Sequence, residues 1–167
     1  MTSSASGKRL EAATELALQG AQAAGHLHHW LRLHPRMRVV GRRAIQVADG
    51  PPDYLAILRD LTPVYVEAKE HGEDRWKLER VEPHQASELS ALPGAQVLVC
   101  WLEERTTVAI PWRVLGPRWR EHAGRTGRAA AGEASLTLAQ AQALGTVVSR
   151  GVALVDWSLL AGALMDE

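Results

Sequence analysis

The stretch PDYLAILRDLTPVYVEAKE, residues 52–70, decides the fold that the sequence predicts. Two apolar runs, rich in residues that favour strands, flank a polar turn, which is the pattern of two antiparallel strands. The second run carries Glu67 and Lys69 inside a strand that is otherwise apolar. Because side chains two residues apart point to the same face of a strand, these two charges are predicted to share one face, while Val66 and Ala68 point into the core.

A turn centred near Leu61 would place Asp53 opposite Lys69 and diagonal to Glu67. Cross-strand neighbours of this kind lie roughly 5–8 Å apart, close enough to share one cation. Two carboxylates and a backbone carbonyl, here that of Ala68, form a hard-oxygen site suited to Mg²⁺ or Mn²⁺. A neighbouring lysine can orient a water or neutralise charge on a phosphate. A plain salt bridge across the two strands remains the alternative.

The last acid of this stretch, Glu70, falls on the other face at the end of the strand. We expect it to turn out to solvent, and assign it no chemical role.

The whole chain predicts an α/β fold, a mixed central sheet with helices on its faces. Segment 26–35 either extends the first helix or begins a strand, and segment 37–47 reads as a hairpin or a bent strand. Segment 111–122 reads as helical or irregular. The clearer elements are helices near 8–24, 79–92, 138–144 and 156–164, and strands at 95–102 and 106–111.

The composition fits one soluble domain, because 167 residues with 46% hydrophobic and 23% charged content are enough to bury a core. We expect residues 1–7 to be a disordered leader and 8–167 to form the domain. The single cysteine, Cys100, excludes an internal disulfide and a cysteine-based zinc site. No stretch resembles a signal peptide or membrane span, so the expected compartment is the cytoplasm, with no membrane partner.

Charge is unevenly distributed although the net charge is zero. Residues 1–48 carry +5, residues 49–111 carry −6, and residues 112–130 carry +4. An acidic centre between two arginine-rich stretches suits a metal site in a surface that binds phosphate, although solvated helix surfaces explain the charges equally well. The candidate DNA contacts are the basic residues Lys8, Arg9, Arg32, Arg36, Arg38, Arg42, Arg43, Arg113, Arg118, Arg120, Arg125 and Arg128.

Pro52-Asp53 followed by Glu67-Ala68-Lys69 resembles the PD-(D/E)XK nuclease signature. More narrowly, the order of segments resembles the RecU family of Holliday junction resolvases. GKRLE, which ends at Glu11, resembles the first-helix motif of that family, and WKLERVEPHQASEL resembles its segment in which a helix carries His-Gln. The resemblance covers roughly residues 8–163.

The resemblance implies a restriction-endonuclease-like fold and a homodimeric, Mg²⁺-dependent endonuclease that places paired nicks in four-way DNA junctions. Mn²⁺ would be able to replace Mg²⁺. Asp53 and Glu67 would bind the metal, with Glu11 contributing directly or through water. Lys69 would act on the attacking water, and Gln85 would position a catalytic side chain or the phosphate.

The sequence also departs from the family. The long stalk between the first helix and the Asp53 strand is shortened, which leaves Arg42 and Arg43 as its only obvious substitutes. Related archaeal resolvases of the Hjc type share the same core, so the branch stays open. Two further readings also stay open: a repair or restriction-type nuclease with the same core, and a non-catalytic DNA-binding module of recombination.

Overall fold

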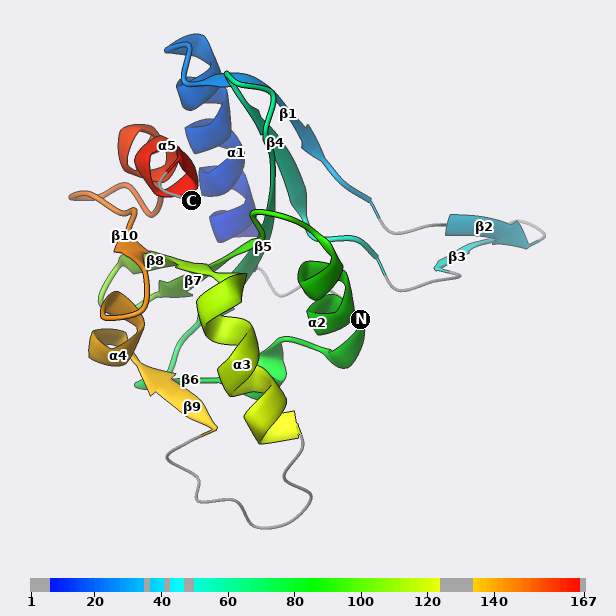
Figure 1. Ribbon diagram of the computed structural model, residues 1–167, viewed down its shortest axis with the longest axis vertical. Coiled ribbons are helices and arrows are strands. Elements are labelled where there is room, and N and C mark those ends of the chain that lie inside the picture. The colour runs from blue at the N-terminus through cyan, green and yellow to red at the C-terminus, as the bar shows by residue number, and fades with distance from the viewer. Residues whose placement is uncertain (1–6, 35–36, 41–42, 47–49, 124–133, 166–167) are drawn as a thin grey trace.

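The computed structural model describes residues 7–34, 37–40, 43–46, 50–123 and 134–165. Its centre is a six-stranded mixed sheet with helices on both faces, which confirms the expected fold class (Figure 1). One pair of neighbours, β5 and β7, is parallel, and the other pairs are antiparallel. In spatial order the strands are β1 (Leu27–Arg32), β4 (Tyr54–Leu58), β5 (Pro63–His71), β7 (Gln96–Trp101), β8 (Thr106–Pro111) and β10 (Thr146–Val147).

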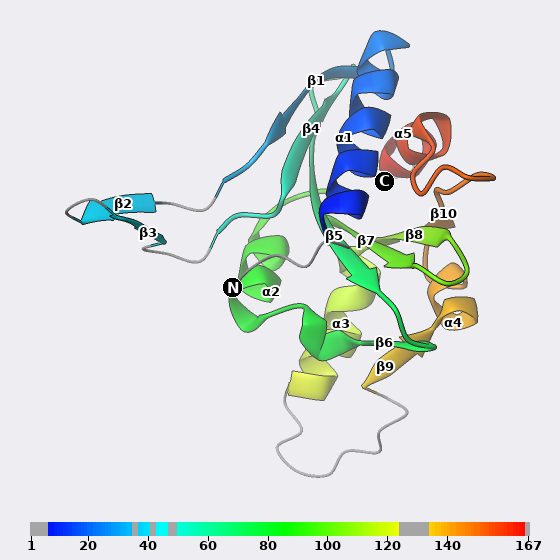
Figure 2. The same cartoon turned by 180° about the vertical axis from the view of Figure 1, so that it is seen from behind.

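Helices α1 (Gly7–Ala23) and α5 (Trp157–Met165) pack against one another and cover one face of the sheet. Helices α2 (Pro83–Ala91) and α3 (Trp112–Ala123) cover the other face (Figures 1 and 2). Because β7 lies between both layers, all six of its residues are buried. Leu98 and Cys100 belong to the core under α1 and α5, whereas Val97, Val99 and Trp101 belong to the core under α2 and α3.

The remaining elements are short. Strands β2 (Met37–Val40) and β3 (Arg43–Gln46) pair only with each other, apart from the central sheet (Figure 2), and confirm the hairpin reading of this segment. The sequence did not reveal β6 (Arg75–Lys77), β9 (Ser135–Thr137) or β10, because two or three residues are too few to show a strand period. The short helices are η1 (Leu78–Arg80) and α4 (Leu138–Gln142).

The first helix is terminated at Gly25, and this decides whether segment 26–35 extends the helix or begins a strand. Gly25 has a φ of 77°, a conformation that glycine adopts without strain. Its N–H donates to Gln22 O, and His26 N–H donates to Ala21 O, both at 2.9 Å, which is the Schellman pattern of helix termination. The chain therefore turns back as strand β1 instead of continuing the helix.

A tight hairpin joins β4 to β5. Residues 59–61 form the loop, Leu58 N–H donates to Thr62 O at 2.9 Å, and Leu61 has a φ of 69°. This is the usual form of a three-residue hairpin loop, a turn followed by a residue in the left-handed region. The side chain of Asp60 accepts from Thr62 N–H at 2.9 Å and stabilises the turn.

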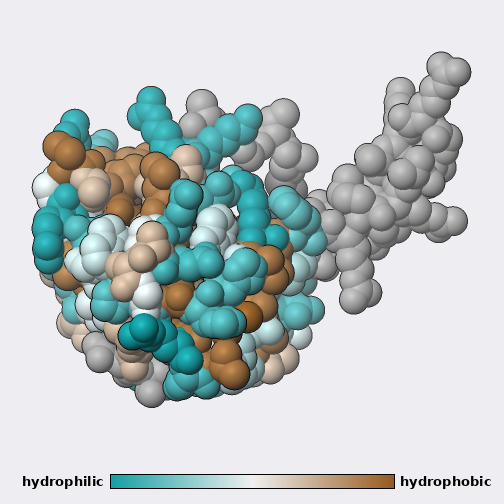
Figure 3. Space-filling view, turned by 90° about the horizontal axis from the view of Figure 1, so that it is seen from above, coloured by the Kyte–Doolittle hydropathy of each residue, from teal (hydrophilic) through white to brown (hydrophobic). Residues whose placement is uncertain are grey.

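The surface of the described residues is mixed in character. Figure 3 shows hydrophilic and hydrophobic residues interspersed, with one hydrophobic cluster at the upper left of the view and smaller ones elsewhere. Large apolar side chains that remain exposed include Leu16, Leu61 and Val152. No helix within the described ranges has the length and apolar character needed to cross a bilayer.

Candidate functional site

The hairpin brings Asp53 next to Glu67. The register pairs Tyr54 with Val66, so its continuation by one residue places Asp53 beside Glu67. The expected pairing of Asp53 with Lys69 is wrong by two residues, because the loop is centred on Asp60 and not on Leu61.

Asp53 is held by backbone groups on two neighbouring strands. Its Oδ2 accepts a hydrogen bond from Ala68 N–H at 2.8 Å. Its carbonyl oxygen accepts from Leu33 N–H, just after β1, at 2.8 Å. The preceding Pro52 is buried. The position of this carboxylate is therefore fixed by the sheet and does not depend on a flexible loop.

Glu67, Lys69 and Gln85 form one connected group on the face of the sheet that α2 covers. Lys69 Nζ lies 2.7 Å from Glu67 Oε1 and donates to Gln85 Oε1 at 2.9 Å. Gln85 Nε2 donates to Glu67 Oε1 at 2.5 Å. The expected shared face of Glu67 and Lys69 is confirmed, since Val66 and Ala68 pack into the core beneath α1.

The start of helix α2 orients Gln85. Gln85 Oε1 also accepts from Glu82 N–H at 3.1 Å, and the Glu82 side chain accepts from the backbone of Gln85. This reciprocal arrangement is a capping box, which satisfies N–H groups at the first turn of a helix. Pro83, in the first turn, lacks an N–H that would need a partner. The side chain of Gln85 thus helps to start the helix and binds both Glu67 and Lys69 of β5.

The two carboxylates are close together and poorly solvated. Only 2% of Glu67 is exposed, and burial, followed by the charge of Asp53, raises the pKa of Glu67 to about 7. Burial also raises the pKa of Asp53, although the hydrogen bond from Ala68 and the charge of Lys69 oppose this. Both carboxyl groups therefore resist ionisation. A positive charge placed between them would favour the ionised carboxylates and lower both pKa values.

No protein-family model matches the chain, and no curated protein sequence matches it either. The chemistry of the site therefore follows from its own geometry. What the geometry provides is a buried carboxylate, Glu67, beside a half-buried one, Asp53, together with an amine that is 18% exposed and an amide that links this amine to Glu67.

Glu11 is not part of this connected group. Its Oε2 lies 2.5 Å from Arg32 Nη2, and Glu15 Oε1 lies 2.6 Å from Arg32 Nη1. The Glu11 carboxylate is still close enough to raise the pKa of Asp53, whereas the charge of Arg32 lowers the pKa of Asp53.

Among the described residues, no three histidine, cysteine, aspartate or glutamate side chains lie together as a metal-binding cluster.

The expectation that Glu70 turns out to solvent is wrong. Its Oε1 accepts from Leu10 N–H in the first turn of α1 at 2.8 Å, and its other carboxylate oxygen is buried. A carboxylate at a helix N-terminus is favourable because it meets free N–H groups and the positive end of the helix dipole. The strand that carries Glu67 and Lys69 thereby also holds α1 in place.

The candidate DNA-binding residues lie on different elements. Lys8 and Arg9 are exposed in the first turns of α1, and Arg113, Arg118 and Arg120 are exposed on α3. For Arg38 and Arg43 only the backbone is described, in β2 and β3. The remaining candidates, Arg36, Arg42, Arg125 and Arg128, lie outside the described residues.

Proposed function

We propose that this chain is a metal-dependent endonuclease that resolves four-way DNA junctions, built on a restriction-endonuclease-like fold. The observation that carries the proposal is the half-buried Asp53 beside the buried Glu67, with Lys69 and Gln85 bonded to Glu67. The resemblance of residues 52–53 and 67–69 to the PD-(D/E)XK signature agrees with this pair.

The donor set of the site fits a divalent cation. Asp53 and Glu67 offer carboxylate oxygens, and hard oxygens are the ligands that Mg²⁺ and Mn²⁺ prefer. Burial is the main cause that raises the pKa of both groups, and a bound cation would favour their ionised forms. These two residues would hold the ion, with the Ala68 carbonyl as a third donor. Mg²⁺ would supply Lewis-acid polarisation of the scissile phosphodiester.

Lys69 is placed to act on the phosphate or on the water that attacks it. Its Nζ is fixed by Glu67 and Gln85, and 18% of its side chain remains exposed, so that substrate can reach it. A fixed ammonium stabilises the negative charge that develops on the phosphate oxygens and orients a water by hydrogen bonding. Hydrolysis would leave 5′-phosphate and 3′-hydroxyl ends.

Selection of the junction would come from the arrangement of the basic side chains and from pairing of two copies of the chain. Paired nicks on opposed strands require two active sites, which a homodimer provides. Contacts to phosphates position a protein without reading the base sequence, so recognition by shape is expected. The exposed basic residues on α1 and α3 are the described candidates for these contacts.

A nicking assay with Mg²⁺ tests the proposal on a mobile four-way junction, a fork and a linear duplex of the same sequence. We expect symmetric nicks in the junction and little cutting of the duplex. Glu67→Gln and Asp53→Asn should abolish cutting and retain junction binding. Unchanged cutting by Glu67→Gln would refute the site.

The other outcomes of this assay identify the alternatives. If the linear duplex were cut as fast as the junction, the chain would be a repair or restriction-type nuclease and not a junction resolvase. Junction binding by the unmodified chain without any cutting, in Mg²⁺ or Mn²⁺, would leave a non-catalytic DNA-binding module.

A further inference from the structure

Tyr65 lies on the same face of β5 as the candidate active site. It is two residues before Glu67, and side chains two residues apart point to one face of a strand, roughly 6.8 Å apart along it. Its ring packs against the hydrophobic core under α2 and α3, whereas Val66 packs under α1 and α5. Across the hairpin the partner of Tyr65 is Leu55, which is two residues after Asp53. This pair is therefore the next one along the sheet face from the two carboxylates.

The two tyrosines of the chain have different surroundings. Tyr54 is buried on the opposite face of the sheet, and its hydroxyl donates to Glu11 O at 3.2 Å. Tyr65 is half-buried, and its hydroxyl forms no hydrogen bond within the described part of the chain. This hydroxyl is also not one of the buried side-chain atoms without a partner that occur there, so it reaches solvent. Tyr65 therefore presents an available hydrogen-bond donor on the face of the candidate active site.

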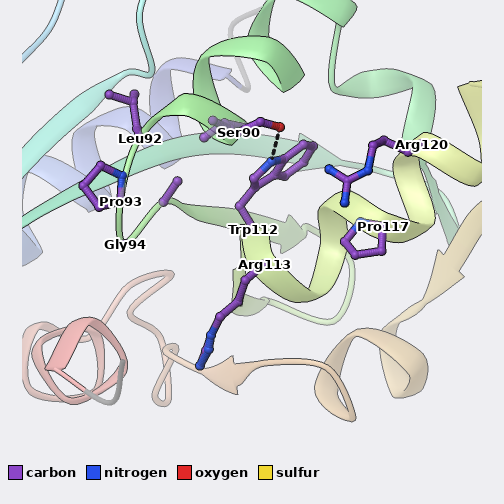
Figure 4. Close-up of a pocket in the computed structure, with 10 residues that line it drawn as sticks. Ser90, Leu92, Pro93, Gly94, Trp112, Arg113, Pro117 and Arg120 are labelled. Atoms are coloured by element: carbon purple, nitrogen blue, oxygen red, sulfur yellow. Dashed lines mark hydrogen bonds between the residues drawn. The ribbon is translucent and has the colours of Figure 1, made fainter.

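The support of the Tyr65 ring is rigid. Strand β7 runs parallel to β5 in a register that places Ala95, at the end of the loop from α2, beside Tyr65. The end of α2 is fixed in turn, because Trp112 Nε1 donates to Ser90 Oγ at 2.9 Å and so connects α3 to α2 (Figure 4). A tyrosine side chain has only two rotatable torsions before its ring, so little entropy is lost when it binds a ligand. The packing of the ring therefore sets the direction of the hydroxyl.

The sheet face next to Tyr65 remains accessible toward β4 and β1. Leu55 on β4 and Leu31 on β1 are register partners on this face. Among the described residues, neither of these leucines belongs to one of the two hydrophobic cores. Leu55 is half-buried, and Leu31 is 45% exposed. A nucleic-acid strand bound at Asp53 therefore has room to continue along this face, past the Tyr65 hydroxyl.

The scissile phosphate has to lie at Asp53 and Glu67, so the backbone of the cut strand is the part of the DNA nearest to this face. The roughly 6.8 Å from Glu67 to Tyr65 corresponds to about two steps of about 3.4 Å along the axis of a duplex. We propose that the Tyr65 hydroxyl donates a hydrogen bond to a backbone phosphate about one or two nucleotides from the scissile phosphate, as tyrosines do in other DNA complexes. This inference rests on the proposed function and adds to it a residue that positions the cut strand.

Fluorescence anisotropy with a labelled four-way junction tests the contact, with Ca²⁺ in place of Mg²⁺ to suppress cleavage. Tyr65→Phe removes only the hydroxyl, so it should bind the junction about tenfold more weakly and keep its melting temperature. Tyr54→Phe is the matched control. It loses a buried, bonded hydroxyl, so its melting temperature should fall while its affinity for the junction stays unchanged. Unchanged affinity in Tyr65→Phe, or an equal loss of affinity in both variants, would overturn the inference.

Replacement of single phosphates by uncharged methylphosphonates identifies the acceptor. The phosphates on each side of the nick are replaced one at a time. We expect one replacement, about one or two nucleotides from the nick, to weaken binding by the unmodified chain about tenfold and to have little further effect on Tyr65→Phe, since the two partners of one contact are not additive. If every replacement weakens the unmodified chain and Tyr65→Phe to the same extent, Tyr65 binds no phosphate and the inference is rejected.

The proposed function fails by a different result. Cleavage that survives Glu67→Gln would reject the active site, while weaker binding by Tyr65→Phe would still support the hydroxyl contact. Loss of cleavage in Glu67→Gln together with unchanged affinity in Tyr65→Phe would reject the hydroxyl contact alone. Failure of the unmodified chain to bind any DNA would reject both.

Discussion

The side-chain amide of Gln85 donates a hydrogen bond to Glu67 across 2.5 Å and thereby connects the first turn of α2 to the middle of β5. The carbonyl of the same amide accepts from Lys69, so the acid and the base of the strand are held through one neutral side chain. A glutamine suits this role because its amide carries both a donor and an acceptor.

Replacement of Gln85 should reduce cleavage more than binding. We expect Gln85→Ala to lower the single-turnover cleavage rate by about 10- to 100-fold, as for other residues that orient metal ligands, with junction affinity within about twofold. Gln85→Glu is the matched variant. It keeps the acceptor for Glu82 N–H, and so the capping box, but its carboxylate repels Glu67. Both variants should lose activity, and full activity in Gln85→Glu would exclude a role for the amide donor.

The period-two alternation of β5 was enough to predict the face shared by Glu67 and Lys69, since it depends only on strand geometry. The partner of Asp53 was mispredicted, because the register depends on which loop residue adopts a positive φ, and Leu61 is an unusual choice for it. The link to Gln85 was suggested only by a family resemblance. Contacts between elements far apart in sequence leave no periodic signal.

The ion pairs of Arg32 illustrate the same limit. The family resemblance implied that Glu11 contributes to metal binding, but the sequence offered no sign that β1 would present an arginine to it. The end of α1 at Gly25 decides this, because it turns residues 27–32 into the strand that runs back beside Asp53.

Removal of Arg32 should make metal binding easier. Arg32 engages the carboxylates of Glu11 and Glu15 and lowers the pKa of Asp53. In Arg32→Ala the Glu11 carboxylate is free to turn toward Asp53, so the Mg²⁺ concentration for half-maximal cleavage should fall about two- to fivefold. Because these pairs are partly exposed, the free energy of unfolding should change by less than about 1 kcal/mol.

Glu11→Gln should shift the Mg²⁺ titration in the opposite direction. If neither variant moves the titration midpoint, Glu11 is a structural partner of Arg32 and takes no part in metal binding. Denaturant unfolding of both variants controls for changes in stability.

Loss of the Lys69 amine should destabilise the fold in a pH-dependent way. Lys69→Met leaves Glu67 buried without its cation, which costs about 3 kcal/mol when the carboxylate is ionised. The pKa of Glu67, already about 7, rises further in this variant, so at pH 6 the acid is neutral and the loss is smaller. Urea unfolding at pH 6 and pH 8 measures this difference, with exposed Lys77→Met as the control. If Lys69→Met lost the same free energy of unfolding at both pH values, an ion pair between Lys69 and the buried Glu67 would be contradicted.

Metal-free stability should fall as the pH rises from about 4.5 to about 7. Burial and the charge of Asp53 raise the folded-state pKa of Glu67 from 4.5 to about 7. Between these values the folded chain binds more protons than the unfolded chain, so deprotonation favours unfolding, and the loss is complete above the folded-state pKa. A melting series in EDTA from pH 5 to pH 8 measures this slope.

Asp53→Asn should be more stable than the unmodified chain at pH 8 without metal, and inactive. The asparagine oxygen can still accept from Ala68 N–H, while the negative charge beside Glu67 is removed. We expect a melting temperature about 3 °C higher for each 1 kcal/mol gained. Addition of Mg²⁺ should stabilise the unmodified chain by ligand linkage and leave Asp53→Asn nearly unchanged. Asp60→Asn is the control, because Asp60 is exposed and its hydrogen bonds lower its pKa. A lower melting temperature for Asp53→Asn in EDTA at pH 8, with an undiminished Mg²⁺ effect, would make Asp53 a structural residue.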